Sequence, residues 1–197
     1  MKNVLAIAFS ALVLATPGKV MATTITFNAL EQAGGGFIDS GAAYTENGFQ
    51  LSGGDLVTAQ QNNVEWYFGS ASMFQNVPNG TTTLTAIGGG PFSLNSIDLA
   101  PVSTVYPSGA SVTFTGNIHG GGTITETFIA PTTYTFATYD FTGFANLDSV
   151  TWTQAFPYTQ ADNLVVDAVP EPASLMLVGT GVLTFVARRR RRKSTSA

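Results

Sequence analysis

Basic residues occupy only two short parts of this 197-residue chain. Two of the eight Lys and Arg residues are Lys2 and Lys19, and the other six form one run from Arg188 to Lys193. All twelve Asp and Glu residues lie between these parts. The middle of the chain therefore has no Lys or Arg to pair with its carboxylates, and the chain has no Cys. We expect its fold to depend on apolar packing and strand pairing, without side-chain salt bridges or disulfides.

The first basic part precedes an apolar run. Lys2 is followed by apolar residues from Val4 to Ala15, then by Thr-Pro-Gly and small or apolar residues up to Ala22. This order of charged, apolar and small residues is typical of a secretory signal peptide. A retained membrane helix is the alternative, but the run is shorter than the roughly 20 residues that span a bilayer. We predict a signal peptide over residues 1–22, removed by signal peptidase during general export.

The second basic part follows another apolar run. Residues 173–187 carry no charge, and at about 1.5 Å per residue they cover roughly 22 Å of a hydrocarbon layer about 30 Å thick. Arginine stems can extend such a span into the headgroup region. We predict a single transmembrane helix over 173–187, with the basic tail on the cytoplasmic side. The adjoining apolar run argues against a nucleic-acid partner. The tail consists of Arg188, Arg189, Arg190, Arg191, Arg192 and Lys193.

A short motif precedes this helix. Val169, Pro170, Glu171 and Pro172 are followed by the apolar run and the arginine cluster. This order resembles the PEP-CTERM sorting signal of exported bacterial proteins, here over residues 169–193. The resemblance implies recognition by an exosortase, a membrane protease-transpeptidase that removes the tail in Gram-negative bacteria that make exopolysaccharide. It implies anchoring in the inner membrane before processing, then a place on the cell surface or outside the cell.

Residues 23–168 are long enough for one domain with its own core. Runs rich in Thr, Val, Ile and aromatic residues follow one another, several with period-two alternation, and Gly-, Pro- and Asn-rich clusters separate them. This pattern predicts an all-β domain, with a jelly-roll-like β-sandwich as the first choice and an up-and-down barrel as the alternative. The expected strands are 25–27, 49–51, 64–68, 82–87, 92–100, 111–116, 123–129, 133–141, 149–154 and 162–168.

A second resemblance extends over most of this domain. The opening ITFNALEQ, the run FSLNSIDL and the closing ADNLVV are similar to the β-sandwich ectodomain common among PEP-CTERM proteins. Members often have an acidic pair after the first strand, where this chain has Asn28 and Ala29. The resemblance implies a fold and brings no catalytic motif.

Few side chains of the domain suit catalysis. The only histidine, His119, lies in the predicted hairpin loop HGGG and has no Cys, Lys or Arg near it in sequence, so we expect a solvated loop residue. The carboxylates are scattered along the sequence, which shows no pair facing a substrate as glycoside hydrolysis requires. We expect no enzymatic activity, and glycan hydrolysis ranks third among the functions considered.

Two kinds of binding remain open. Ca2+ takes roughly six to eight oxygen ligands, and jelly-roll carbohydrate-binding domains often hold such an ion near their first and last strands. The candidate ligands here are Asn28, Glu31, Asp162 and Asn163. The alternative for these four residues is turn capping.

Exposed aromatic residues can stack on sugar rings, although aromatic residues in strands are more often part of the core. The candidates for stacking are Trp66, Tyr67, Trp152 and Tyr158.

These observations favour a structural or adhesive protein of the cell surface or of the biofilm matrix. It is exported, processed by an exosortase and associated with exopolysaccharide. A carbohydrate-binding module, with or without Ca2+, is the alternative.

Overall fold

The computed structural model describes residues 22–32, 36–60, 70–103, 109–154 and 156–168. The predicted signal peptide and sorting segment lie outside these ranges, as does the expected strand 64–68. No helix within the described ranges is long and apolar enough to cross a membrane.

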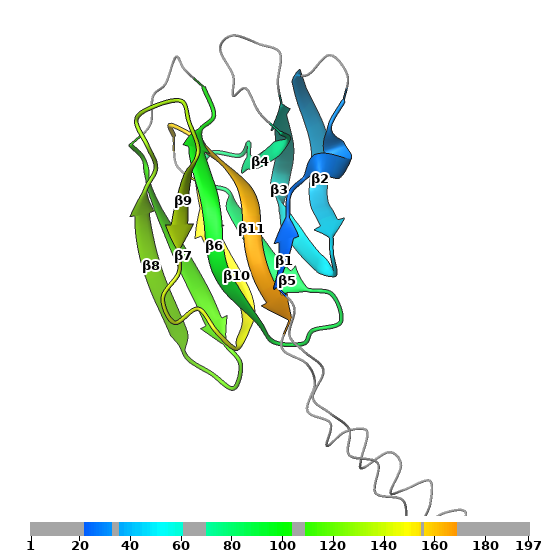
Figure 1. Cartoon of the computed structure of the whole chain (residues 1–197), viewed down its shortest axis with the longest axis vertical. Coiled ribbons are helices and arrows are strands. Elements are labelled where there is room, and N and C mark those ends of the chain that lie inside the picture. Colours follow the sequence, from blue (N-terminus) through cyan, green and yellow to red (C-terminus); the bar gives the residue numbers. More distant parts are fainter. Residues whose placement is uncertain (1–21, 33–35, 61–69, 104–108, 155, 169–197) are drawn as a thin grey trace, which may run out of the picture. The chain divides into compact units, whose positions relative to one another are not determined.

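The prediction of an all-β domain is confirmed (Figure 1). The elements are β1 (Ala22–Ile25), the 3-10 turn η1 (Asn28–Leu30), β2 (Gly36–Glu46), β3 (Phe49–Gln60), β4 (Ser72–Gln75), β5 (Thr81–Ala86), β6 (Phe92–Pro101), β7 (Ser111–Ile118), β8 (Thr123–Ile129), β9 (Ala137–Asp140), β10 (Leu147–Thr153) and β11 (Thr159–Ala168).

The strands form one antiparallel sheet with the order β8-β7-β10-β5-β3-β4-β11-β6-β9, to which β1 adds beside β11 and β2 beside β3. A further pairing, Leu147 of β10 with Phe92 of β6, closes six of these strands into a ring. The fold is thus a barrel-like closed sheet with extra strands. Most neighbours in this ring are distant in sequence, which distinguishes it from an up-and-down barrel.

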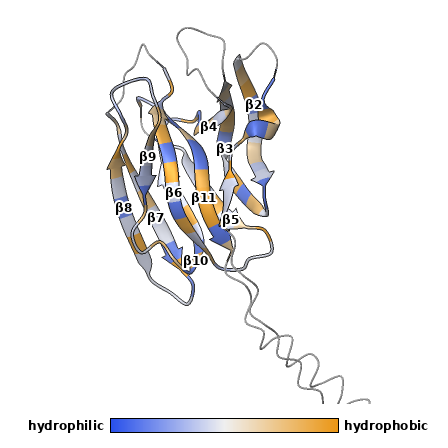
Figure 2. Cartoon of the chain, in the orientation of Figure 1, coloured by the Kyte–Doolittle hydropathy of each residue, from blue (hydrophilic) through white to orange (hydrophobic). Residues whose placement is uncertain are grey.

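Side chains that alternate along the strands form the buried core. In β7, Val112 and Phe114 are buried while Thr113 is exposed, as the period-two pattern predicted. The ring centroid of Phe114 lies 5.4 Å from that of Trp152 and 5.1 Å from that of Phe141. Burial of each such ring contributes roughly 1.5–3 kcal/mol. The same alternation of hydrophobic and hydrophilic positions is visible along β6 and β11 in Figure 2.

Several strand predictions differ from the structure, among them the expected strand 49–51, since β3 runs from Phe49 to Gln60. Strands β2 and β4 were not expected: β2 is rich in Gly, Ala and Ser and has no fully buried residue, whereas all four residues of β4 are buried. The expected strand 133–141 is wrong in extent, because only 137–140 pair with β6. The strand expected over 25–27 ends at Ile25, since Phe27 has a left-handed φ of 56° before η1.

A bulge in β11 interrupts its pairing with β6. Asp162 lies opposite Asp98 and Val165 opposite Ser96, so two residues of β11 face one residue of β6. Asn163, in the bulge, has a φ of 48°, a conformation that Asn tolerates better than most residues. A second register shift follows, because Val165 lies opposite Ser96 and Val166 opposite Leu94, which leaves Asn95 as an extra residue in β6. The alternation of buried residues in β6 is interrupted at this point, since Asn95 and Ser96 are both half-buried between the buried Leu94 and Ile97.

Candidate functional site

The bulge places a carboxylate inside the domain. Asp162 is 1% exposed, and it accepts hydrogen bonds from Ser70 Oγ at 2.8 Å and from the backbone N–H of Asn163 at 2.7 Å. The side-chain amide of Asn163 donates to Asp98 Oδ2 at 2.9 Å, and Thr138 Oγ1 donates to Asp98 Oδ1 at 2.6 Å. The bulge thus joins two acidic residues of neighbouring strands through one asparagine.

The position of Asp162 changes its acidity. Burial raises the pKa of its carboxyl to about 6, and the two hydrogen bonds from Ser70 and Asn163 offset only part of this effect. The negative charges of Asp98 and Glu46 raise the pKa further. Asp162 is therefore protonated over a range of mildly acidic pH in which an exposed Asp is charged.

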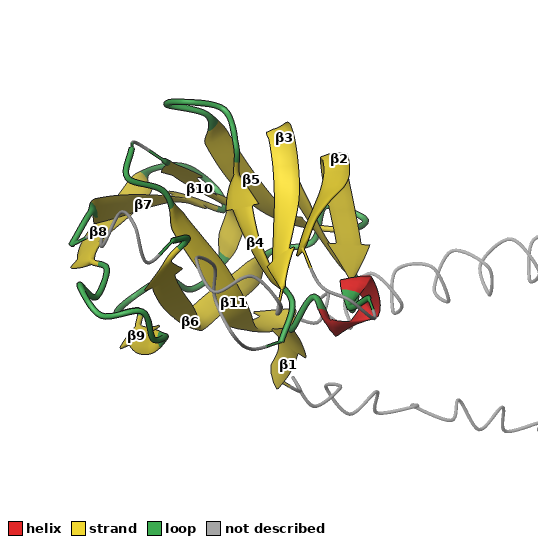
Figure 3. Cartoon of the chain, turned by 90° about the horizontal axis from the view of Figure 1, so that it is seen from above, coloured by secondary structure: helices red, strands yellow, loops and turns green. Residues whose placement is uncertain are grey.

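The other two predicted calcium ligands lie at η1, next to the end of β2 (Figure 3). The Asn28 amide, with its nitrogen facing Glu31, donates to Glu31 Oε1 and to the Thr26 carbonyl, both at 3.2 Å. Glu46 holds the chain before this turn: its carboxylate accepts the backbone N–H of Phe27 at 2.9 Å and that of Thr26 at 3.1 Å. No sequence pattern marked Glu46, whose partners are 19 and 20 residues away.

The four predicted ligands therefore fall into two hydrogen-bonded pairs, Asn28 with Glu31 and Asp162 with Asn163. Because β1 pairs with β11, with Ile25 opposite Leu164, the turn after β1 begins close to the bulge. Among the described residues, no three His, Cys, Asp or Glu side chains are grouped as ligands of a metal ion. The calcium site stays a prediction.

One side-chain contact bears on the expectation that the domain has no side-chain salt bridge, because it becomes an ion pair when its imidazole is protonated. His119 Nδ1 lies 2.7 Å from Asp148 Oδ1, and the side chains are 56% and 49% exposed. The expectation counted only Lys and Arg as cations and overlooked the single histidine. His119 does lie in the turn between β7 and β8, as predicted.

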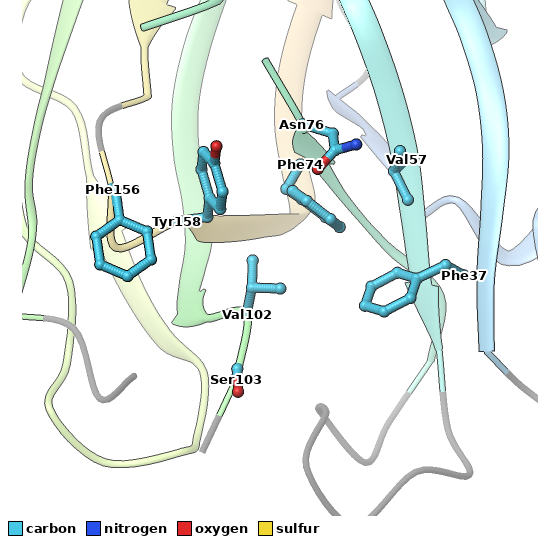
Figure 4. A pocket seen from close by; sticks show the side chains of 8 residues that line it. All are labelled: Phe37, Val57, Phe74, Asn76, Val102, Ser103, Phe156 and Tyr158. Atoms are coloured by element: carbon cyan, nitrogen blue, oxygen red, sulfur yellow. The ribbon is translucent and has the colours of Figure 1, made fainter. Parts of the chain in front are cut away.

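An aromatic groove lies elsewhere on the domain (Figure 4). Its volume is about 230 Å³. Its walls come from β2, β3 and β4, from the chain after β4 and β6, and from the chain before β11. The residues that line it are Phe37, Val57, Phe74, Asn76, Val102, Ser103, Phe156 and Tyr158.

Four aromatic rings follow one another along the groove. The centroids of Phe37 and Phe74 are 5.8 Å apart, those of Phe74 and Tyr158 6.1 Å, and those of Tyr158 and Phe156 6.0 Å. Phe37 is 44% exposed and Phe156 63% exposed, so apolar ring faces are accessible to solvent. Val57 belongs to a buried apolar cluster that also contains Phe74 and packs against Tyr158.

Hydrogen bonds fix the strands around this groove. At its polar side, Asn76 Nδ2 donates to Asp55 Oδ2 at 2.9 Å. Behind it, the buried Gln160 donates to the Pro101 carbonyl at 2.7 Å and accepts from Ser72 Oγ at 2.5 Å, joining β11, β6 and β4. Buried amides with both ends bonded hold these strands in one arrangement. The groove is therefore a preformed feature.

The predicted stacking residues have different positions in the structure. Trp152 is 3% exposed and belongs to the core. Tyr158 lines the groove, whereas Trp66 and Tyr67 lie outside the described residues. Phe37 and Phe156 were not among the predicted residues, because their proximity depends on strands far apart in sequence.

The C-terminal part of the chain matches a known family model. Residues 168–192 match the PEP-CTERM protein-sorting motif. The chain carries a PEP-CTERM sorting motif. Such a motif implies an exported protein that is recognised by an exosortase and anchored by its C-terminal segment before processing. The resemblance seen in Val-Pro-Glu-Pro and the arginine cluster is confirmed.

The chain is also similar to solved structures of family 29 carbohydrate-binding modules. A variant of one such module in complex with mannohexaose has a TM-score of 0.45 and 16% identity, over 76% of this chain and 92% of that chain. A second family 29 module has a TM-score of 0.39 and 15% identity, over 76% and 89% of the two chains. No curated protein sequence matches the chain.

Proposed function

We propose that this PEP-CTERM protein is a structural or adhesive component of the cell surface or biofilm matrix, associated with exopolysaccharide. The sorting motif at residues 168–192 is the observation that supports it. In this proposal signal peptidase removes residues 1–22, the helix 173–187 holds the precursor in the inner membrane, and an exosortase cuts near Val169–Pro172. The delivered part is a jelly-roll-like domain over residues 23–168.

The arrangement of polar groups favours binding over catalysis. Asp162 is buried and accepts a hydrogen bond from Ser70, so its carboxylate cannot contact a glycosidic bond at the surface. The exposed pair of His119 and Asp148 has no hydroxyl or thiol nucleophile hydrogen-bonded to the imidazole within the described chain.

The topology leads to a test of sorting. Replacing Arg188–Arg192 by Ser is expected to reduce retention of the precursor in the inner membrane, because basic residues fix the cytoplasmic side of a membrane helix. Fractionation followed by immunoblotting measures the retained share. His119→Ala, which changes a residue of the exported domain, is expected to be retained like the parent chain. Equal retention of the Ser variant and the parent would refute the proposed topology.

A carbohydrate-binding module is the second candidate, and the aromatic groove favours it. Pyranose rings present C–H groups on their faces, which pack against aromatic rings, while amide and hydroxyl groups at the rim can bond to sugar hydroxyls. The accessible faces of Phe37 and Phe156, with Asn76 beside them, provide both kinds of contact. The proposed calcium ligands Asp162 and Asn163 lie outside the groove lining, so Ca2+ would act by stabilising the domain.

Substitution in the groove tests this candidate. Phe156→Ala is expected to weaken glycan binding about tenfold, which corresponds to about 1.4 kcal/mol, without loss of folding because the ring is largely exposed. Ile87→Ala, at a side chain that is 60% exposed outside the groove, is the matched control. A glycan array followed by calorimetry, each with Ca2+ and with a chelator, measures both the affinity and any calcium dependence. Equal affinities of the two variants would exclude the groove as the site.

A further inference from the structure

An uncharged face covers five neighbouring strands of the sheet. One row runs directly from Thr125 of β8 through β7, β10 and β5 to Ser52 of β3, and every residue in it carries a hydroxyl group. Rows on either side also contain only uncharged polar residues. We call this surface the threonine face; it consists of Thr123, Thr125, Thr127, Thr113, Thr115, Asn117, Ser149, Thr151, Thr153, Thr81, Thr83, Thr85, Gln50 and Ser52.

Neighbouring side chains on this face bond to one another. The hydroxyl oxygens of Thr113 and Thr127 are 2.8 Å apart, and Asn117 Nδ2 donates to Ser149 Oγ at 2.8 Å. The face ends at β8, which lies at an outer edge of the sheet in both views (Figures 1 and 3). In the described chain, β8 pairs with β7 alone.

The edge at β8 lacks the features that usually prevent strand addition. Its seven residues pair with β7 without a register shift and include no Pro or Gly. The other edge strands differ: β1 and β9 have four residues each, and β2 has two register shifts around Gly41. Short edges and bulges oppose edge-to-edge pairing, whereas a regular unpaired strand provides a template for it. Only β8 combines length with regularity.

The charge distribution allows a second copy of the chain to contact this edge. Residues 23–168 hold eleven carboxylates and no Lys or Arg, so contact between two copies is unfavourable wherever carboxylates meet. The outward side chains of β8 are Thr123, Thr125, Thr127 and Ile129, and Ile129 is 66% exposed. The one acidic residue, Glu126, lies on the opposite face, where it accepts the backbone N–H of Thr142 at 3.0 Å.

We propose that β8 is a self-association edge, at which a second copy of this chain adds its own β8 in antiparallel orientation, centred on Thr125. In this register Thr125 faces Thr125 of the second copy, and Thr123 faces its Thr127. These pairs reproduce the Thr113–Thr127 pair already present on the face. A register centred on Glu126 places two carboxylates opposite each other, which is destabilising. The proposal is independent of whether the groove binds a glycan.

Two matched variants of the full chain, purified in detergent, test this edge. Thr125→Glu places two like charges opposite each other. It is expected to raise the dissociation constant of the dimer, measured by sedimentation velocity, at least tenfold. Thr153→Glu makes the same charge change on the same face but on β10, two strands from the edge, and is expected to change this dissociation constant less than twofold. Equal weakening by both variants would show contact through the face and overturn the proposal.

The absence of cysteine allows a direct test of the register. Thr125→Cys is expected to form a disulfide-linked dimer on mild oxidation, because facing β-carbons in an antiparallel pair lie roughly 4.5–5.5 Å apart. Thr153→Cys is the control and is expected to stay mostly monomeric. A parent chain that is monomeric at every concentration, together with equal crosslinking of the two Cys variants, would refute the proposal.

Discussion

Asp162→Asn is expected to stabilise the domain at pH 7.5 by about 2–3 kcal/mol. The pKa of this carboxyl is 3.8 in the unfolded reference and about 6 in the folded domain, so folding favours the protonated form. The group therefore contributes stability below pH 4, and this contribution is lost as the pH rises through 6. The difference of about two pKa units corresponds to about 3 kcal/mol at neutral pH. Asn is uncharged at every pH and can keep the bond from the Asn163 N–H.

Urea unfolding from pH 4 to pH 8 measures this effect. The difference in free energy of unfolding between Asp162→Asn and the parent should be small near pH 4 and reach its full value above pH 6.5. Asp140→Asn is the control, because Asp140 is exposed and removal of its charge should change stability little. A difference that is constant across this range would mean that burial does not shift the titration of Asp162.

Sequence predicted the strands in which one face is buried and the other exposed. This condition holds for β7 and β10, where buried and exposed residues alternate in the structure. It fails for β4, which is buried on both faces, and for β2, which lies outside the closed ring and has mostly exposed or half-buried residues. Period-two alternation reports one-sided burial, so a strand that is buried on both faces, like β4, or fully buried on neither, like β2, is harder to recognise.

The two candidate sites differ in how much sequence could reveal. Asp162 was a candidate because it lies in the last strand, but its side-chain hydrogen bond comes from Ser70, 92 residues away. The groove joins Phe37 to Phe156, which no local pattern relates. Tyr158 was a candidate as an aromatic residue near a strand, and so was Trp152, which is a core residue. Composition identifies the type of side chain, whereas strand order decides which side chains meet.

The sorting motif implies that the domain, with its bulge and its groove, reaches the outside of the cell. Eleven carboxylates without Lys or Arg repel acidic polymers unless cations bridge them. The uncharged groove and the threonine face are the surfaces on which contact does not require such cations.

Trypsin is expected to leave the mature protein intact even after denaturation. Every Lys and Arg residue of the chain lies at positions 2, 19 and 188–193. Removal of residues 1–22 and cleavage at Pro170–Pro172 discard all of them, and trypsin cuts only after Lys or Arg. Denaturation excludes the folded state as the cause of resistance. The protein is recovered from the medium, denatured and treated with trypsin, and its intact mass is then measured by mass spectrometry. A mass close to that of residues 23 to about 170 is expected.

The precursor provides the matched control for this result. A variant with Glu171→Ala and both flanking prolines replaced by Ala is expected to escape exosortase, stay with the membrane fraction and lose its basic tail to trypsin after denaturation. Both proteins share residues 23–168, so a difference in cleavage can arise only at the ends. Release of an arginine-containing C-terminal peptide from the protein in the medium would show that the tail is retained after export. The motif would then act as a lasting anchor, and processing by an exosortase would be the wrong explanation for the position of the basic residues.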